Sequence, residues 1–200
     1  AAQGHLRPER LDEFLILGEL GLDGGLRPVR GALPAAALAS RMGLRGVLLP
    51  ARSAREAAVI AGVDSLGVAH LSEVVSFLIG ERDVPPSVPV EDGPAPAATE
   101  DLSDVRGQER AKRALEIAAA GGHALLLVGP PGTGKTMLAR RLAALLPPLT
   151  VEEAIETSAI HSVAGLLDGR GLVRRRPVRA PHHTISDVGL VGGGTPPRPG

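Results

Sequence analysis

The sequence predicts an α/β protein made of two partial units that a proline-rich linker joins. Three observations predict this class. Short apolar runs alternate with helix-like segments, a glycine-rich loop lies between a predicted strand and a predicted helix, and residues 81–101 are rich in Pro and acidic residues without any period. Such a stretch is typical of an extended linker, so we expect one unit at 1–80 and another at 102–200.

The composition is that of a globular protein. Of its 200 residues 44% are hydrophobic and 22% are charged, and the formal net charge is zero, so no global field favours nucleic acid or an anionic membrane as partner. The absence of cysteine excludes disulfides and thiolate metal sites. No run of about 18 apolar residues and no signal-peptide pattern occurs, so we expect a cytoplasmic protein without a membrane partner.

The strands of the first unit are predicted from short apolar runs. Runs at 14–17 and 26–29 flank Asp23-Gly24-Gly25, which favours a hairpin between them. A buried strand is predicted at 47–49, and a weaker one at 66–68.

Three helices are predicted between and after these strands. The first is Ala-rich and covers 33–42, the second covers 53–61 and opens with the capping box Ser53-Ala54-Arg55-Glu56, and the third covers 72–79 with Ser72 as its cap. Each is followed by a glycine suited to a helix end, namely Gly43, Gly62 and Gly80.

The second unit is predicted to open with the segment 104–108, followed by a helix that ends at Ala120 before a glycine pair. A continuous apolar run at 124–128 predicts a buried parallel strand, and 137–146 predicts a helix that Pro147 stops. A capping box at 150–153 starts a further helix to about residue 161, and after Val163 the sequence loses its period.

The loop between the strand at 124–128 and the helix at 137–146 fits G-x-x-x-x-G-K-[ST], the phosphate loop of nucleoside triphosphatases. It consists of Gly129, Pro130, Pro131, Gly132, Thr133, Gly134, Lys135 and Thr136. Glycines let backbone N–H groups approach phosphates, and the helix N-terminus adds unpaired donors. Lys135 is expected to reach the β- and γ-phosphates, and the hydroxyl of Thr136 to ligate Mg²⁺.

The second unit resembles the Mg-chelatase-like branch of the AAA+ ATPases. The similarity lies in 105–123, which leads to the phosphate loop, in 146–150 and 179–184, and in the glycine run 192–194. Within that branch the chain is most similar to the ComM/YifB group, whose members join a Lon-protease-type domain to a chelatase-type AAA+ module.

The first unit supports this resemblance. Its segments 17–20, 26–31 and 47–50 are similar to the later half of a Lon-type fold. Proteolysis in that fold needs a serine activated by a lysine, but Lys112 and Lys135 are the two lysines of this chain, and Leu33 aligns with the catalytic lysine. We therefore expect a non-proteolytic Lon-type domain with a packing or interaction role.

The resemblance implies ATP and Mg²⁺ as cofactors and extends the predicted nucleotide site. It adds Met137 after the loop, and it places Val105, Gly107 and Gln108 along the adenine, although an ordinary helix start is the alternative for these three. It also implies a ring oligomer, with a hexamer expected, and ATP-driven branch migration or helicase work on DNA. The alternatives are a magnesium-chelatase motor subunit and a non-catalytic nucleotide-binding scaffold.

The resemblance also makes both ends look cut. An AAA+ module should continue into a Walker B strand that ends in Asp-Glu, whereas the only such pair here is Asp12-Glu13. No catalytic residue is therefore assigned within these 200 residues, and we expect the chain alone not to turn over ATP, whatever it binds.

Two further signals are weaker. His182-His183 suggests a metal site, but adjacent residues chelate poorly and hydrogen bonding within a loop is the preferred interpretation. The densest basic stretch is compatible with a solvated loop or with DNA contacts in a ring pore, and no aromatic residue accompanies it. It consists of Arg170, Arg174, Arg175, Arg176 and Arg179.

Overall fold

The structure, a computed structural model, describes residues 11–89, 100–167, 171–195 and 199. These residues form two compact units. The first contains 11–89, 152–167, 171–173, 185–195 and 199, and the second contains 100–151 and 174–184. The division into domains at 1–80, 81–101 and 102–200 stays a prediction, and 90–99 lie outside the described residues.

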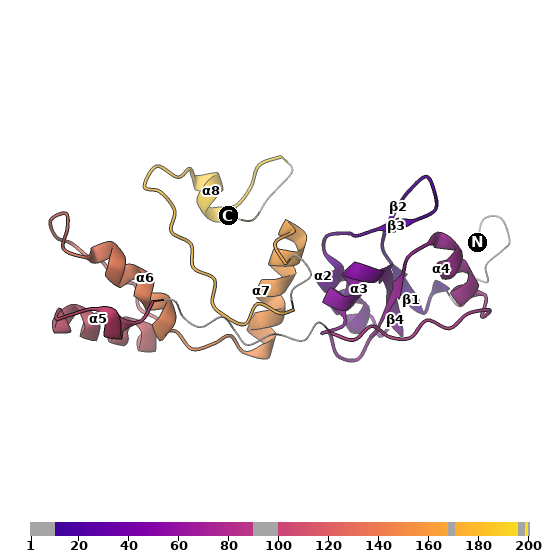
Figure 1. The fold of residues 1–200 in the computed structure, drawn as a ribbon, viewed down its shortest axis with the longest axis horizontal. Helices are drawn as coiled ribbons and strands as arrows, with labels where there is room; N and C mark the ends of the chain where they lie inside the picture. Colours follow the sequence, from indigo (N-terminus) through magenta and orange to yellow (C-terminus); the bar gives the residue numbers. More distant parts are fainter. Residues whose placement is uncertain (1–10, 90–99, 168–170, 196–198, 200) are drawn as a thin grey trace. The chain divides into compact units, whose positions relative to one another are not determined.

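A parallel sheet with helices on both faces forms the first unit, which confirms the α/β class. Its strand order is β1 (Phe14–Ile16), β4 (Gly46–Pro50) and β5 (Asp64–Val68). The helices are α2 (Ala32–Arg41), α3 (Ala51–Ala57) and α4 (Leu71–Leu78), and Figure 1 shows α2 and α3 on one side of β4 and α4 on the other.

The central strand β4 feeds both hydrophobic cores of this unit. Val47 and Leu49 belong to the cluster made with α2 and α3, and Leu48 belongs to the cluster made with α4. Successive side chains of a strand point to opposite faces, so a continuous apolar run fits a strand covered on both sides. The predicted strands at 47–49 and 66–68 are thereby confirmed.

The predicted hairpin forms, but with a different first strand. The turn around Gly24 joins β2 (Glu19–Leu20) to β3 (Leu26–Arg27), whereas β1 pairs in parallel with β4. The prediction of pairing between 14–17 and 26–29 was wrong. The apolar side chains of β1 gain more free energy from burial in the parallel sheet than they would gain in an exposed hairpin.

Two predicted helix caps were also wrong. Ser53 is buried within α3, where its hydroxyl accepts from the Val29 N–H at 3.1 Å, and the helix starts after Pro50 without a side-chain cap. In α4 the cap is His70, whose Nδ1 accepts from the backbone N–H of Ser72 at 3.1 Å. The hydroxyl of Ser53 bonds to a distant backbone group instead of capping a helix, and the cap expected at Ser72 is provided by His70.

The beginning of the predicted linker lies along β5. Pro86 forms a bridge with Leu66, and the backbone N–H of Ser87 donates to the Ser65 carbonyl at 2.7 Å. Val84 packs against the core on the α4 face. These contacts extend the hydrogen bonding of the sheet beyond its last strand.

The second unit is built from η1 (Leu102–Asp104), α5 (Glu109–Gly121) and α6 (Lys135–Leu145). Its core consists of Val105, Leu115 and Leu138, with further apolar side chains partly buried around them. The predicted helices are confirmed here, and Gly122 caps α5 at φ 63° as its sequence position suggested.

Two more helices complete the structure. In α7 (Val151–Ala164), the hydroxyl of Ser162 accepts from the Gly31 N–H at 3.1 Å and Ser158 accepts from the Val173 N–H at 2.8 Å, both within the first unit. The short α8 (Asp187–Val191) was not predicted from the sequence. Across the described ranges, no helix is both long and apolar enough to cross a bilayer.

Candidate functional site

The glycine-rich loop leads directly into α6. Gly132 and Gly134 adopt φ values of 82° and 81°, a left-handed region that residues with a Cβ rarely occupy. Gly134 is the N-cap of α6 and has no side chain to cap it, so the helix starts with donors that a bound anion can use. Lys135 and Thr136 are the first two residues of this helix.

The ammonium group of Lys135 is held inside the loop. Its Nζ lies 2.8 Å from the Gly129 carbonyl oxygen, 2.6 Å from that of Pro130 and 3.3 Å from Oγ1 of Thr133. An ammonium has three donors and each finds an acceptor here. The Thr133 hydroxyl also donates to the Pro130 carbonyl at 3.0 Å. The loop is therefore folded around the ammonium group of Lys135.

The residues present fit a Mg²⁺ ion that arrives with phosphates. Thr136 is exposed next to Lys135 and offers one hydroxyl oxygen. Among the described residues, no group of three or more His, Asp or Glu side chains could hold a metal ion by itself. Mg²⁺ commonly keeps several waters and is bound by substrate phosphates with one or two carboxylates. In this chain Thr136 would supply one oxygen, and no carboxylate is assigned to the ion.

The segment 105–108 lies against this loop. The Gln108 amide nitrogen is 3.5 Å from the Thr133 carbonyl oxygen and 3.3 Å from the position that a Cβ on Gly134 would take. Gly107 and Gln108 have φ values of 66° and 59°, and Gln108 is the one residue other than glycine with a positive φ among the described residues. Val105 is 3% exposed in the core. Of the three predicted residues, Gln108 contacts the loop, whereas Val105 packs in the core with Leu138.

The predicted strand at 124–128 does not form among the described residues. Leu126 and Val128 are 84% and 85% exposed, and only Leu127 packs against the core of the unit. A strand is held by hydrogen bonds to a neighbour, and nothing in the described ranges pairs with this run. The prediction was wrong because an apolar run specifies a strand only where a partner strand lies beside it.

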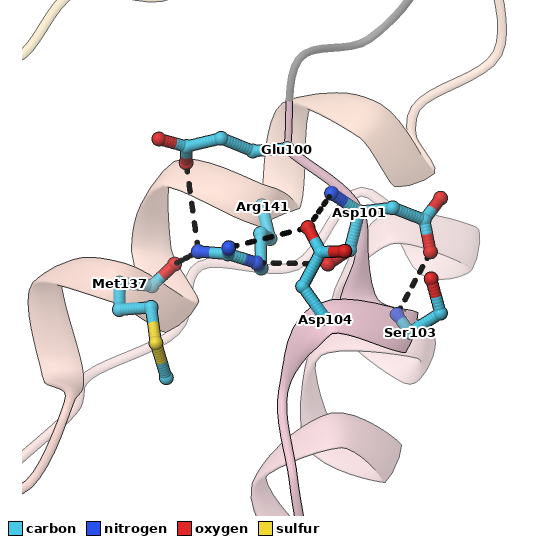
Figure 2. Close-up of polar contacts among 6 residues, drawn as sticks. All are labelled: Glu100, Asp101, Ser103, Asp104, Met137 and Arg141. Atoms are coloured by element: carbon cyan, nitrogen blue, oxygen red, sulfur yellow. Dashed lines mark hydrogen bonds and ion pairs between the residues drawn. The ribbon is translucent and has the colours of Figure 1, made fainter.

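Arg141 was not singled out from the sequence, yet it joins α6 to the segment before α5 through several polar contacts. Figure 2 shows its guanidinium between the acidic groups that precede α5 and the backbone of α6. Nε donates to the Asp101 carbonyl at 2.8 Å, and Nη1 donates to the Met137 carbonyl at 3.0 Å. Nη1 lies 3.6 Å from Oε2 of Glu100, and Nη2 lies 3.3 Å from Oδ2 of Asp104.

The acidic side of this cluster is a capped 3₁₀ turn. Asp101 accepts from the Ser103 N–H at 2.8 Å, and Asp104 accepts from the Asp101 N–H at 3.0 Å, which closes a capping box (Figure 2). The backbone N–H of Ser103, followed by its side chain, lowers the pKa of Asp101 from its usual value. The sequence does not single out Arg141, because Arg140 precedes it and is the same residue type. Arg141 lies three residues after the buried Leu138 and therefore on the same face of the helix, whereas Arg140 does not.

His182 of the histidine pair takes part in hydrogen bonding within its loop, which was the preferred interpretation of the sequence. The rings of His182 and His183 lie with centroids 4.1 Å apart. Nδ1 of His182 is 2.8 Å from the Thr184 hydroxyl and 3.4 Å from the Thr184 backbone nitrogen, which donates to it. These are hydrogen bonds within one loop.

Part of the arginine stretch lies beside the end of α6. Arg175 and Arg176, together with Arg140, line a cavity of about 250 Å³ that Pro147 and Pro148 also border. Nε of Arg176 donates to the Pro147 carbonyl at 3.2 Å. Arg174, Arg175 and Arg179 are exposed, and Arg170 lies outside the described residues.

The α/β class and the glycine-rich loop motif narrow the kind of protein, and comparison with known proteins identifies its family. The model of magnesium chelatase, subunit ChlI, matches residues 101–200, and a second model, subunit ChlI of Mg-chelatase, matches residues 1–53. The chain therefore belongs to the Mg-chelatase-like family, and its similarities are of the ComM/YifB type.

Similar proteins occur in several bacteria. The chain is 46% identical over 200 residues to the uncharacterized protein YifB of Escherichia coli, which covers 100% of this chain and 39% of YifB. It is 43% identical over 204 residues to the competence protein ComM of Haemophilus influenzae, covering 100% of this chain and 40% of ComM. It is 50% identical over 188 residues to an uncharacterized protein of Mycobacterium tuberculosis, and the match covers 94% of this chain and 37% of that protein. The chain thus spans about two fifths of these relatives.

Proposed function

We propose that this chain binds ATP with Mg²⁺ at the loop 129–136, and that the intact protein is an ATP-driven AAA+ motor. The loop folded around the ammonium of Lys135 carries the proposal, because it combines left-handed glycines, a helix N-terminus and a fixed cation. In this proposal Lys135 meets the β- and γ-phosphates, and Thr136 contacts Mg²⁺. Met137 follows them in α6, and Val105, Gly107 and Gln108 line the base.

The chemistry assigned to these 200 residues is binding and orientation. Bound Mg²⁺ would neutralise charge that develops on the phosphates, while the loop N–H groups and Lys135 would hold them in place. Hydrolysis needs a further carboxylate or polar group that orients water, and we assign none in this chain. We therefore propose ATP hydrolysis for the intact protein and tight binding without turnover for these residues alone.

The experiment that tests the nucleotide site uses the two lysines of the chain. Lys135→Ala removes the central cation of the loop, and Lys112→Ala removes a lysine of the same unit that pairs with Glu109 at 3.2 Å. Truncating one partner of a hydrogen-bonded charge pair costs about 2–5 kcal/mol, so ATP·Mg²⁺ affinity should fall at least about 30-fold in the first variant by calorimetry. Lys112→Ala should bind within about twofold of the parent, since it breaks only a pair with the largely exposed Glu109.

Equal ATP affinity in the parent and Lys135→Ala would contradict the nucleotide site. Steady phosphate release by the 200-residue chain, removed by Lys135→Ala, would contradict the proposal that these residues bind without turnover.

A second element of the proposal is the substrate of the motor. We propose that a ring of subunits, hexameric in our proposal, works on DNA, and the exposed arginines after α7 favour this over a chelatase motor. The chelatase alternative rests on the family model, which is named for a magnesium chelatase subunit. A non-catalytic scaffold is the third candidate. We also propose that the first unit is a non-proteolytic Lon-type domain, because both lysines lie in the second unit.

Salt dependence tests the DNA element. Each phosphate that a protein neutralises contributes a slope of roughly −0.9 in log affinity against log salt for duplex DNA. Replacing Arg174, Arg175, Arg176 and Arg179 by Ser should make this slope shallower and weaken binding equally across sequences, since phosphate contacts carry no base information.

The matched control for this experiment removes the same charge from the first unit. It replaces Arg27, Arg41, Arg45 and Arg82 by Ser. An unchanged slope in the first quadruple variant, or an equal change in both, would contradict a role of the arginine stretch in DNA binding. ATP affinity should survive both sets of replacements.

A further inference from the structure

The cluster around Arg141 links two parts of the second unit that the sequence separates. Three of its four acceptors lie in 100–104, the segment that leads into Val105, and the fourth is a carbonyl of α6 itself. The side chain is only 12% exposed, so these contacts are made largely away from water. Arg141 therefore holds the start of that segment on the helix that begins with Lys135 and Thr136.

The other end of the same segment is attached to the same element. Gln108 reaches the Thr133 carbonyl of the loop, and Val105 lies in the core next to Leu138 of α6. Residues 101–108 thus span from the middle of α6 back to its N-terminus, held at both ends. At this second attachment, Gly107 and Gln108 adopt left-handed conformations, which are unfavourable for Gln108 and persist only where surrounding contacts enforce them.

We propose that Arg141 is a positioning residue that fixes the segment 105–108 relative to the phosphate loop, and thereby sets the part of ATP affinity that comes from the base. The inference rests on the proposed nucleotide site. In the proposed site the loop 129–136 holds the phosphates with its own backbone, and the segment 105–108 lies beside the base. Arg141 holds the start of that segment and Gln108 contacts the loop, so loss of Arg141 should affect the base more than the phosphates.

Arginine is the suitable residue for this role. Its planar fork donates in several fixed directions, here to a backbone carbonyl of Asp101, to the carboxylate of Asp104 and to the carbonyl of Met137. A lysine at this position would keep the charge but could not reproduce this geometry from a single ammonium. We therefore expect Arg141→Lys to rescue only part of the effect of Arg141→Met.

Two ligands separate the base from the phosphates: ATP, and inorganic tripolyphosphate, each with Mg²⁺. We expect Arg141→Met to lower ATP affinity about tenfold and to leave tripolyphosphate affinity within about twofold, so the preference for ATP falls. The matched control is Arg140→Met, the exposed arginine one position earlier on α6, which should leave both affinities within about twofold. Calorimetry on the full-length protein that contains this chain supplies all the values.

A second variant covers a failure of Arg141→Met to fold, which its thermal transition would reveal. Asp104→Asn keeps an acceptor for the Asp101 N–H while removing the charge that faces Nη2. It should reduce the preference for ATP over tripolyphosphate in the same direction and by less.

The outcomes separate this inference from the proposed function. Equal losses for both ligands would overturn it, because Arg141 would then support the loop as a whole, and so would unchanged ATP affinity in folded Arg141→Met and Asp104→Asn. Failure of the parent protein to bind ATP, or binding that Lys135→Ala leaves intact, would instead overturn the nucleotide site itself.

Discussion

Leu138 of α6 lies in the small hydrophobic core of the second unit. It is 2% exposed, and among the described residues two other buried side chains, Val105 and Leu115, belong to this core, with partly buried apolar side chains around them. Shortening a buried leucine to alanine typically costs about 2–5 kcal/mol, through lost transfer energy and the cavity that remains. Nine buried residues form the larger cluster of the first unit, so the same loss matters far more in the second.

We expect Leu138→Ala to open the second unit locally while the first unit stays folded. A loss of about 3 kcal/mol raises the opening equilibrium constant by roughly 100-fold. Hydrogen exchange of the 200-residue chain should then speed up by about that factor in α5 and α6 and remain unchanged in β4 and α2. Leu126→Ala is the matched control, because Leu126 is 84% exposed and its shortening should change nothing.

Two results would refute this reasoning. Equal acceleration of exchange in α5 and in β4 would mean that the two units unfold as one. Unchanged exchange in α6 of a folded Leu138→Ala protein would mean that the small cluster does not hold the unit together.

Two further predictions concern the first unit. A hydrogen bond from the Ala69 N–H, and then Arg82, lower the pKa of Glu73 below 4.5. The ionised carboxylate therefore stabilises the fold above about pH 4.5, and this stabilisation is lost as the pH falls through the lowered pKa. The difference in stability between the parent and Glu73→Gln should shrink in acid, and a difference that stays constant from about pH 7 to 3 in thermal melts would contradict this. A Cβ at Gly46 would lie 2.6 Å from the Asp64 carbonyl oxygen in the ladder, so Gly46→Ala should cost about 1–3 kcal/mol in denaturant unfolding, whereas Gly18→Ala, with only ordinary contacts near 3.6 Å, should be within about 0.5 kcal/mol of the parent.

Local patterns in the sequence predicted the helices well. Apolar runs flanked by glycines gave α2, α5 and α6 with bounds within about two residues of the structure, a normal margin for helix ends. The loop motif at 129–136 is also visible in the sequence, because phosphate binding needs particular residue types at fixed spacing, and its role as a nucleotide site stays a prediction. The family followed from the same motifs and is confirmed by the match over 101–200.

Interactions between distant residues could not be predicted in this way. The apolar run 124–128 reads as a strand by itself, yet pairing is a property of two segments, and no described segment lies beside it. Ser53 reads as a cap, but its hydroxyl bonds the backbone of Val29, which is 24 residues away.

The sequence by itself determined the helices, the class of fold and the composition of the phosphate loop, because these depend on neighbours along the chain. Only the tertiary structure decided that β1 joins the parallel sheet rather than the hairpin, and that Arg141 rather than Arg140 faces the acidic turn before α5. Both choices depend on which surface a side chain buries. Burial is decided by packing between elements, where a rotation of one helix position separates a buried charge from an exposed one.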